Sequence, residues 1–366
     1  MAQPTTVPLF LLRRLIPYVA AILFLKLFLF GGNDASRLNV LSNTIATSST
    51  SLSAQRHDAC AAHGWRPYKQ PPDKPRKVYD LFMLNDELDW LEIRLNTLAD
   101  HVDYFVIVES NITFTARPKP LHFPNNQSRV SQFSSKIIYH LLENPPLNSR
   151  RTWDYEDHQR NAMFTQVIPQ LKGAQAANLG DVLLISDIDE IPRPETLDLL
   201  RGCNFNKRLT LRSRFYYYGF EFLHKGPEWA HPQATTYAGP SKTILPADLR
   251  NGEGGWRFLS YFEKADLANA SWHCSSCFPT VAEMLNKMAS FSHTRMNKEV
   301  FRNQDRMVDR VKKGLDLWDR KGEEYEILAE NRDVPSWVAE NKERFGYLLD
   351  RQGEDAGFVD YAVPEE

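Results

Sequence analysis

Two carboxylates stand two positions apart where an apolar stretch of the chain ends. Asp187 and Asp189 follow the run 181–186 (DVLLIS), and Glu190 comes directly after them. Carboxylates at i and i+2 that leave a strand can approach one hard divalent cation, and Mg²⁺ and Mn²⁺ commonly share such sites with substrate phosphates. In a sugar transfer from a nucleotide diphosphate, the metal would neutralise charge on the leaving group. The alternative is a solvated acidic loop that caps the next helix.

The elements around these acids alternate between strand and helix patterns. Such alternation is typical of an α/β domain with a mostly parallel sheet. Ligands of such sheets bind at the carboxyl ends of the strands, so Glu109, which ends the second strand run, is expected in one crevice with the acids at 187–190. The expected strands are 78–84, 104–108, 136–141 and 181–186, and the expected helices are one that follows 84, capped by Asn85 or Asp86, and 154–171.

The pattern changes after residue 194. An aromatic, β-prone stretch at 209–223 precedes loops rich in Gly, Pro and Trp, and helical patterns return at 279–291 and 298–318. No internal repeat or second core is evident, so we expect one catalytic domain at 78–352, followed by a loosely held acidic tail at 353–366.

The N-terminal segment predicts a membrane anchor. Residues 1–32 hold a charge of +3, which leaves −5 for the rest of a chain whose total is −2. The apolar run within 15–32 is long enough for a thin bilayer, and the preceding arginines predict a cytosolic tail at 1–14 and a lumenal body. A Ser/Thr- and Pro-rich stretch at 33–77 predicts a flexible stem. The alternative is a cleaved signal peptide.

Charge and cysteine content narrow the class further. The near-neutral total argues against a general nucleic-acid binder. The four cysteines, Cys60, Cys203, Cys274 and Cys277, indicate disulfides in an oxidising lumen, with three pairings possible. The short Cys274–Cys277 spacing also allows zinc or a redox pair, although no second ligand pair at short spacing accompanies it.

Eight segments, in order along nearly the whole lumenal body, carry a family resemblance. They are 78–95, which contains YDLF and NDELDWLEIRL, then VIVESNITFTARPKPLHF (106–123), WDYEDHQRNA (153–162), DVLLISDIDEIPRP (181–194), SWHCSSCF (271–278), FSHTRMN (291–297), KGLDLW (313–318) and RFGYLLD (344–350). The sequence resembles glycosyltransferase family 17. One departure is Ala116, where the family usually has glycine.

The resemblance implies a GT-A-like single catalytic domain and an inverting reaction that uses a carboxylate base. It implies UDP-GlcNAc as donor and a divalent cation, Mn²⁺ or alternatively Mg²⁺. It also implies β-1,4 transfer of N-acetylglucosamine to a mannose of an N-glycan or glycoprotein, of the bisecting type. With the anchor, this predicts a type II protein of the Golgi or ER membrane.

The family motifs also give expectations for individual residues. Asp187 and Asp189 match the D-x-D that holds metal and diphosphate, and Glu190 is a candidate for orienting the donor or acceptor. His293 is a candidate third metal ligand. The residues expected to contact substrate are Asn85, Glu87, Glu109, Gln159, Arg160, Trp272 and His273.

Each of these residues also has a structural alternative. Glu109 is equally compatible with a helix-capping or ion-paired acid, Trp272 with a core residue, and each histidine with a satisfied structural residue. The catalytic base stays open among Glu221, Glu253, Glu263 and Asp266.

Two other classes compete with the transferase. One is a dehalogenase-type phosphatase, whose nucleophile motif is also a strand followed by D-x-D but usually on the first strand. The other is a metal-dependent glycan-binding protein that has lost turnover.

Overall fold

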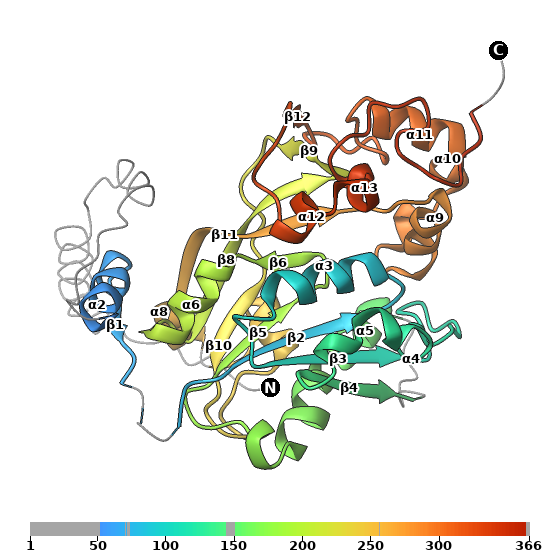
Figure 1. The fold of residues 1–366 in the computed structure, drawn as a ribbon. Coiled ribbons are helices and arrows are strands. Elements are labelled where there is room, and N and C mark those ends of the chain that lie inside the picture. Colours follow the sequence, from blue (N-terminus) through green and yellow to red (C-terminus); the bar gives the residue numbers. More distant parts are fainter. Residues whose placement is uncertain (1–51, 70, 72–73, 144–150, 256, 364–366) are drawn as a thin grey trace, which may run out of the picture. The chain divides into compact units, whose positions relative to one another are not determined.

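The computed structural model of the chain describes residues 52–69, 71, 74–143, 151–255 and 257–363 (Figure 1). Residues 53–366 form one compact unit. Within the described ranges, no helix combines the length and apolar character needed to cross a bilayer. The predicted tail 1–14 and anchor 15–32 lie outside the described residues, as does the first part of the predicted stem.

Four parallel strands lie side by side in a ten-stranded sheet. Their order is β4 (Ile137–Leu142), β3 (Tyr104–Ser110), β2 (Val78–Leu84) and β5 (Val182–Ser186). All four strands predicted from apolar runs are therefore confirmed, and so is their parallel arrangement.

The remaining strands make the other half of the sheet mixed. β10 pairs antiparallel with both β5 and β8, so β8 runs in the direction of the four parallel strands. β11 pairs parallel with β8 and antiparallel with β6. The stretch 209–223 forms two antiparallel strands, separated by Tyr218 with φ 64°. The bounds are β6 (Glu190–Pro192), β8 (Arg208–Tyr217), β9 (Gly219–His224), β10 (Gln233–Thr236), β11 (Lys264–Ser275) and β12 (Tyr325–Ile327).

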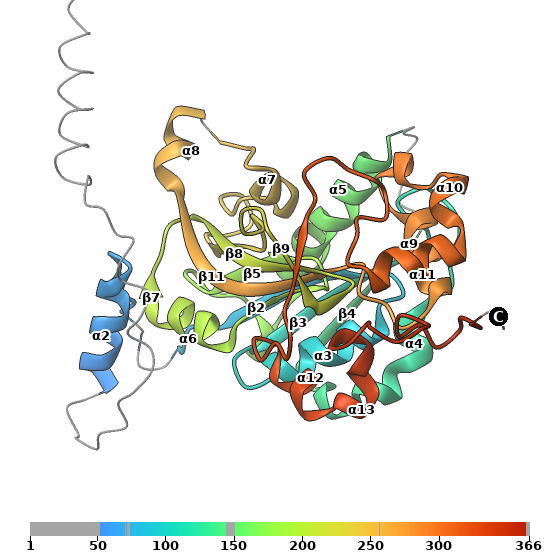
Figure 2. The same ribbon diagram turned by 90° about the horizontal axis from the view of Figure 1, so that it is seen from above.

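Helices cover both faces of the parallel strands (Figure 2). α3 (Leu88–Leu98) and α12 (Ser336–Glu340) pack on one face, and α5 (Thr152–Ala162) with the π-helical turn Met163–Val167 packs on the other. Successive side chains of a strand point to opposite faces, so β2 supplies both clusters and reads as a continuous apolar run. Val78, Phe82 and Leu84 lie in the cluster with α3, and Tyr79, Leu81 and Met83 in the cluster with α5.

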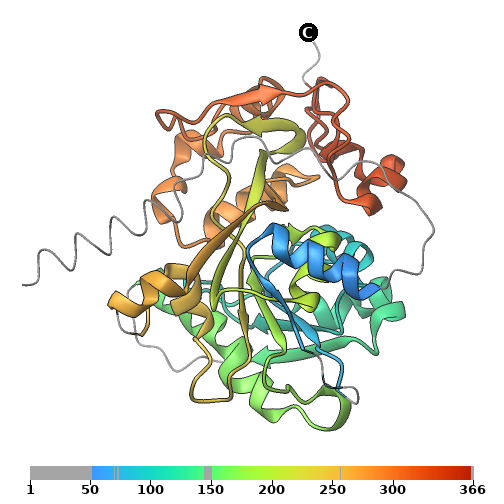
Figure 3. The ribbon, with the colours of Figure 1, turned by 90° about the vertical axis from the view of Figure 1, so that its left-hand side faces the viewer.

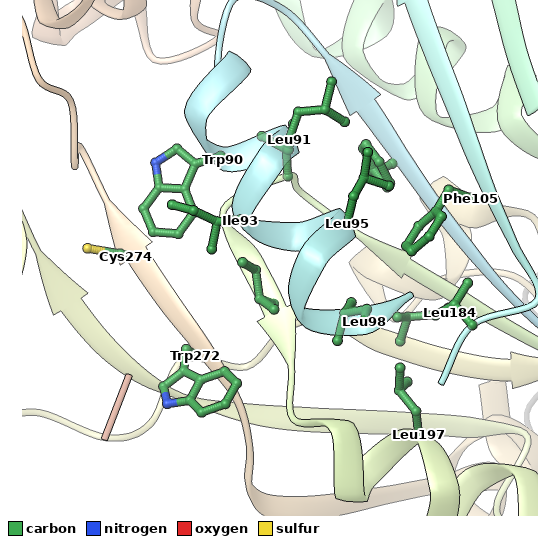
Figure 4. Close-up of a cluster of buried hydrophobic side chains, with 14 of the residues drawn as sticks. Trp90, Leu91, Ile93, Leu95, Leu98, Phe105, Leu184, Leu197, Trp272 and Cys274 are labelled. Atoms are coloured by element: carbon green, nitrogen blue, oxygen red, sulfur yellow. The ribbon is translucent and has the colours of Figure 1, made fainter. Parts of the chain in front are cut away.

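The apolar stripe of α3 is the centre of the first cluster (Figure 4). Full burial of one Leu or Ile side chain contributes about 1.5–3 kcal/mol, so several such residues hold this helix on the sheet. The stripe residues and the side chains around them are Trp90, Leu91, Ile93, Leu95 and Leu98, with Phe105, Leu184, Leu197 and Trp272.

Two helix predictions need correction. The N-cap residue of α3 is Glu87, not Asn85 or Asp86, and it makes no side-chain capping bond to the helix. The Glu87 carboxylate instead accepts from the backbone N–H groups of Asn85 and Asp86. The helix expected at 154–171 is α-helical only to Ala162, because a π-helical turn and a 3₁₀ turn that contains a proline follow.

Further helices pack around this framework. Predicted helices at 279–291 and 298–318 are confirmed in part, the second as two short helices. The bounds are α4 (His122–Asn126), α6 (Pro194–Gly202), α7 (Pro246–Asn251), α8 (Arg257–Glu263), α9 (Val281–Ser290), α10 (Glu299–Arg302) and α11 (Gln304–Lys312).

Part of the predicted stem, 33–77, is folded onto the domain (Figure 3). α2 (Leu52–Ala62) is joined to the body by the Cys60–Cys203 disulfide, and β1 (Arg66–Pro67) pairs with β7 (Cys203–Asn204). The buried Arg76 guanidinium donates to three backbone carbonyls of the body. The Ser- and Pro-rich composition did not reveal this attachment, because it depends on a cysteine 143 positions away.

The acidic tail predicted at 353–366 is also partly folded. Phe358 is buried against the cluster beneath α9, and the Asp360 carboxylate accepts from the N–H groups of Val281 and Ala282 at the start of that helix. A carboxylate at a helix N-terminus satisfies donors that have no partner within the helix.

The two disulfides differ in the loops they close, and this gives a stability test. Cys60–Cys203 spans 143 positions and Cys274–Cys277 spans 3, while all four sulfurs belong to buried residues. Loop-closure entropy predicts that replacing the first pair with serines costs about 3 kcal/mol more than replacing the second. Urea unfolding of the two double variants, followed by tryptophan fluorescence, measures the difference. Equal losses would contradict it.

Candidate functional site

A cavity of about 660 Å³ opens at the carboxyl ends of the strands, and we call it the strand-end cavity. It is lined where β2, β5, β8 and β11 end, the edge of the sheet at which a crevice was expected, although Glu109, which was expected in it, is not among the lining residues. Eight of the predicted site residues line it, and Glu109, Glu190 and Trp272 do not. The eight are Asn85, Glu87, Gln159, Arg160, Asp187, Asp189, His273 and His293.

Asp187 lies between two guanidinium groups. Arg160 Nη1 donates to Oδ1 at 2.9 Å, and Arg250 Nη2 donates to Oδ2 at 2.5 Å. Burial alone would raise the pKa of Asp187, but the two arginines outweigh it, so the pKa is lowered. Arg160, predicted to contact substrate, thus lines the cavity and pairs with Asp187.

Glu190 is fully buried and orients protein groups. Its carboxylate pairs with both terminal nitrogens of Arg250 at 2.8 Å and accepts from Trp229 Nε1 at 2.7 Å and from the Asp187 N–H at 2.9 Å. Burial would raise the pKa of Glu190, but Arg250 holds it well below the ordinary value. The expectation of a direct substrate contact is replaced by a role in fixing Arg250, Trp229 and the turn.

Asp189 has different neighbours. Lys287 Nζ from α9 lies 3.3 Å from Oδ2, and His273 Nε2 lies 3.7 Å from Oδ1. Burial would lower the pKa of Lys287, but Asp189 and Glu87 outweigh it and raise the pKa. Lys287 therefore stays charged inside the cavity and can attract an anionic ligand.

The turn that presents these acids is held from beneath by Arg94. Its guanidinium pairs with both carboxylate oxygens of Asp80 at 2.6 and 2.7 Å. It also donates to the carbonyls of Asp187, Ile188 and Glu190 and to the hydroxyl of Ser186. In the sequence, the visible signal was Asp80, a charged residue inside the otherwise apolar run 78–84.

Glu109 is a helix-capping and ion-paired acid, which is the structural alternative given for it above. Both carboxylate oxygens are used by the protein, which removes the predicted contact with uridine or ribose. The donors are Lys119 Nζ at 2.9 Å, the N–H groups of His122 at 2.5 Å and Phe123 at 3.1 Å, and the Tyr139 hydroxyl at 3.0 Å.

Trp272 belongs to the core and not to a sugar platform. Its indole N–H donates to Asp333 at 2.9 Å, and the Arg193 guanidinium lies 4.3 Å from its ring. On the same strand, the next side chain, His273, points to the opposite face and into the cavity.

The predicted metal set of Asp187, Asp189 and His293 is not assembled. His293 packs edge-on against Trp153, and among the described residues no group of three or more His, Cys, Asp or Glu side chains is arranged to hold a metal ion. The histidine beside Asp189 is His273.

Other cavity residues could not be found from local patterns. Only the fold brings Arg250 of α7 to Asp187. Only the fold brings Lys287 and Trp229 into the cavity wall. None of the four residues considered as catalytic base, Glu221, Glu253, Glu263 and Asp266, is among the residues that line the cavity.

Ala116 shows why glycine suits its position. It has φ 58°, and its N–H donates to the Thr113 carbonyl in a tight turn beside the cavity. This left-handed conformation is strained for any residue with a Cβ.

Comparison with known proteins assigns the chain to a class. The family model described as glycosyltransferase family 17 matches residues 43–354. The protein therefore belongs to glycosyltransferase family 17, as the motifs indicated.

Among curated proteins, the chain is similar to three mammalian enzymes named β-1,4-mannosyl-glycoprotein 4-β-N-acetylglucosaminyltransferase. It is 26% identical to the Homo sapiens protein over 310 residues, 24% to the Rattus norvegicus protein over 323 and 25% to the Mus musculus protein over 310. Each match covers 76% of this chain and 56% of the relative, so the chain spans little more than half their length.

Glu87 provides a pH test of the cavity's electrostatics. Burial raises the pKa of Glu87 to about 7, and the nearby carboxylates of Asp86 and Asp189 contribute to this shift. Lys287 acts in the opposite direction. The ordinary pKa of this carboxyl group is 4.5, so between pH 4.5 and about pH 7 the folded state binds more protons than the unfolded state. Glu87 therefore makes the free energy of unfolding fall as pH rises through that window.

Glu87→Gln removes this dependence. We expect the variant to gain on the order of 2 kcal/mol relative to the unsubstituted chain between pH 4.5 and pH 8. Urea unfolding at both pH values, in EDTA, measures it, with Glu340→Gln on an exposed site as control. A difference that does not change with pH would overturn this electrostatic description.

Proposed function

We propose that this protein is an inverting glycosyltransferase of GT-A-like fold that transfers N-acetylglucosamine from UDP-GlcNAc, in β-1,4 linkage, to a mannose of an N-glycan. The observation that carries the proposal is the placement of Asp187 and Asp189. Both line a cavity at the carboxyl ends of strands in a chain that belongs to a glycosyltransferase family. The names of the mammalian relatives support the choice of sugar and of acceptor.

The charges around the motif fit a divalent cation. Four carboxylates, those of Glu156, Asp187, Asp189 and Glu190, lie among three cations, Arg160, Arg250 and Lys287. Glu87, whose pKa is raised to about 7, adds to the excess of negative charge when it is ionised, and this excess favours a cation such as Mn²⁺ or Mg²⁺. We propose that Asp189 and Asp187 hold the ion. Such ions are commonly bound through one or two carboxylates and completed by substrate phosphates, so a third protein ligand is not required.

When bound, the ion would neutralise charge on the departing diphosphate. The chain's own groups have three further roles in the proposal. Lys287 adds a fixed positive charge beside Asp189, while Arg160 and Arg250 hold Asp187 ionised. Asn85 and Gln159 supply polar contacts for the donor from the wall formed by the parallel strands.

We further propose that the protein acts in the Golgi or ER, anchored as a type II membrane protein through residues 15–32. The sequence pattern of that segment supports this. A different glycan or a glycolipid as acceptor, and a glycan-binding protein without turnover, are the alternatives that the assay below separates.

The purified full-length chain should release UDP from UDP-GlcNAc when Mn²⁺ and an N-glycan acceptor are present, and EDTA should abolish the release. Loss of a ligand that stabilises the leaving group is worth several kcal/mol, so Asp189→Asn should lower kcat about 100-fold or more. Asp198→Asn, an exposed site on α6, serves as control.

Each alternative gives a different result. A glycan-binding protein would bind the acceptor without releasing UDP from any donor. A phosphatase would release phosphate from p-nitrophenyl phosphate without a nucleotide sugar. Full activity in EDTA would contradict the metal assignment alone.

A further inference from the structure

The proposed transfer needs a group that removes the proton of the acceptor hydroxyl, and the four acids considered from the sequence lie outside the cavity. We propose that Glu323 is this base and that His224 positions its carboxylate. The inference rests on the proposed function and names a residue for the acceptor side of the same cavity.

The Glu323 carboxylate and the His224 imidazole lie side by side on the cavity wall. Glu323 Oε2 lies 3.2 Å from His224 Nε2, and both residues line the cavity. A carboxylate beside an imidazole is an arrangement in which one group orients the other for proton transfer.

The backbone fixes the pair in place. His224 ends β9 and pairs with Tyr325 of β12, and the Lys225 N–H donates to the Glu324 carbonyl at 2.9 Å. Glu323 lies in the loop directly before β12, so the ladder between β9 and β12 fixes the chain on one side of it and holds His224 at the end of β9.

The imidazole of His224 has no room to turn away. A Cβ at Gly226 would lie 2.3 Å from Cε1 and 2.9 Å from Nδ1, so the chain passes directly over this edge of the ring. Phe215 packs on the ring with centroids 5.1 Å apart. Neither ring nitrogen has a hydrogen-bond partner of good geometry among the described residues, which leaves Glu323 as the polar group that Nε2 faces.

Phe215 also connects this pair to the D-x-D motif. Its ring centroid lies 4.9 Å from that of His273 and 5.1 Å from that of His224, so the two imidazoles are at most 10.0 Å apart. His273 in turn lies beside Asp189, with 3.7 Å between Nε2 and Oδ1. The space between the motif and Glu323 is thus bounded by aromatic rings, which suit the apolar face of a sugar.

Other acids of the cavity are used differently. Glu156 and Asp187 pair closely with Arg160, at 2.8 and 2.9 Å, and Glu228 accepts from the backbone N–H of Asn269 with both oxygens. Glu323 has a longer contact, with 3.9 Å between Oε2 and Arg320 Nη2. The Glu323 side chain keeps 27% of its surface exposed, so an acceptor can reach it and the proton can leave to water.

The step balances as a single displacement. The acceptor oxygen forms a bond to the anomeric carbon of the donor sugar, and the bond from that carbon to the diphosphate oxygen breaks with its electron pair on UDP. The acceptor proton passes to the Glu323 carboxylate and is then released to solvent.

The test compares Glu323→Gln with Glu324→Gln, the same change at the next position, which lies outside the cavity. General bases contribute about 10²–10⁴-fold, so Glu323→Gln should lower kcat by that factor. UDP binding, measured by calorimetry, and the unfolding midpoint should stay unchanged. Glu324→Gln should keep kcat within about threefold. His224→Gln should lower kcat less and shift the pH profile of kcat, which a merely structural role would not do.

The outcomes separate the inference from the function it rests on. If the unsubstituted chain releases no UDP with any donor and acceptor, the proposed function itself fails. If it is active and Glu323→Gln keeps its kcat, or Glu228→Gln alone loses it, the assignment of Glu323 is overturned.

Discussion

The arrangement of this molecule depends on one buried guanidinium. Arg94 is fully enclosed, and its five donors are met by Asp80, by the Ser186 hydroxyl and by three carbonyls of the turn at 187–190. Charges taken out of water are tolerated only when such partners are complete. The Arg94–Asp80 pair therefore links α3 and β2 to the turn after β5. This link determines the directions in which Asp187 and Asp189 leave the sheet.

Above that turn, the two halves of the sheet bring different chemistry to one cavity. The parallel half supplies amides, carboxylates and arginines around Asp187. The mixed half supplies aromatic rings, with Phe215 between His273 and His224. A wall of charged and amide groups thus faces a wall of aromatic rings. Glu190 links the halves, because it binds Arg250 of α7 and Trp229 of the loop between β9 and β10.

The sequence predicted what depends on neighbouring residues. Apolar runs predicted the four parallel strands, and the position of Asp187 and Asp189 after one of these runs predicted that they lie at the strand ends, where they line the cavity. Partners distant in the chain were missed: Arg250 and Lys287 reach the motif only through the fold, and Cys60 joins a cysteine 143 positions away. Glu109 was misassigned because a carboxylate at a strand end looks alike whether its partner is substrate or protein. For Trp272, the sequence does not show which face of β11 the ring lies on, and the structure places it in the core.

The Cys60–Cys203 link also has a mechanical meaning. Cys203 lies shortly before β8 begins, and Arg76, which bonds to its carbonyl, lies shortly before β2 begins. The covalent attachment is therefore made at the amino-terminal ends of the strands, whereas the cavity opens at their carboxyl ends. A pulling force on the chain that precedes Cys60 would therefore reach the domain at the end of the sheet opposite the cavity. The disulfide would transmit this force to Cys203 and not to the turn at 187–190.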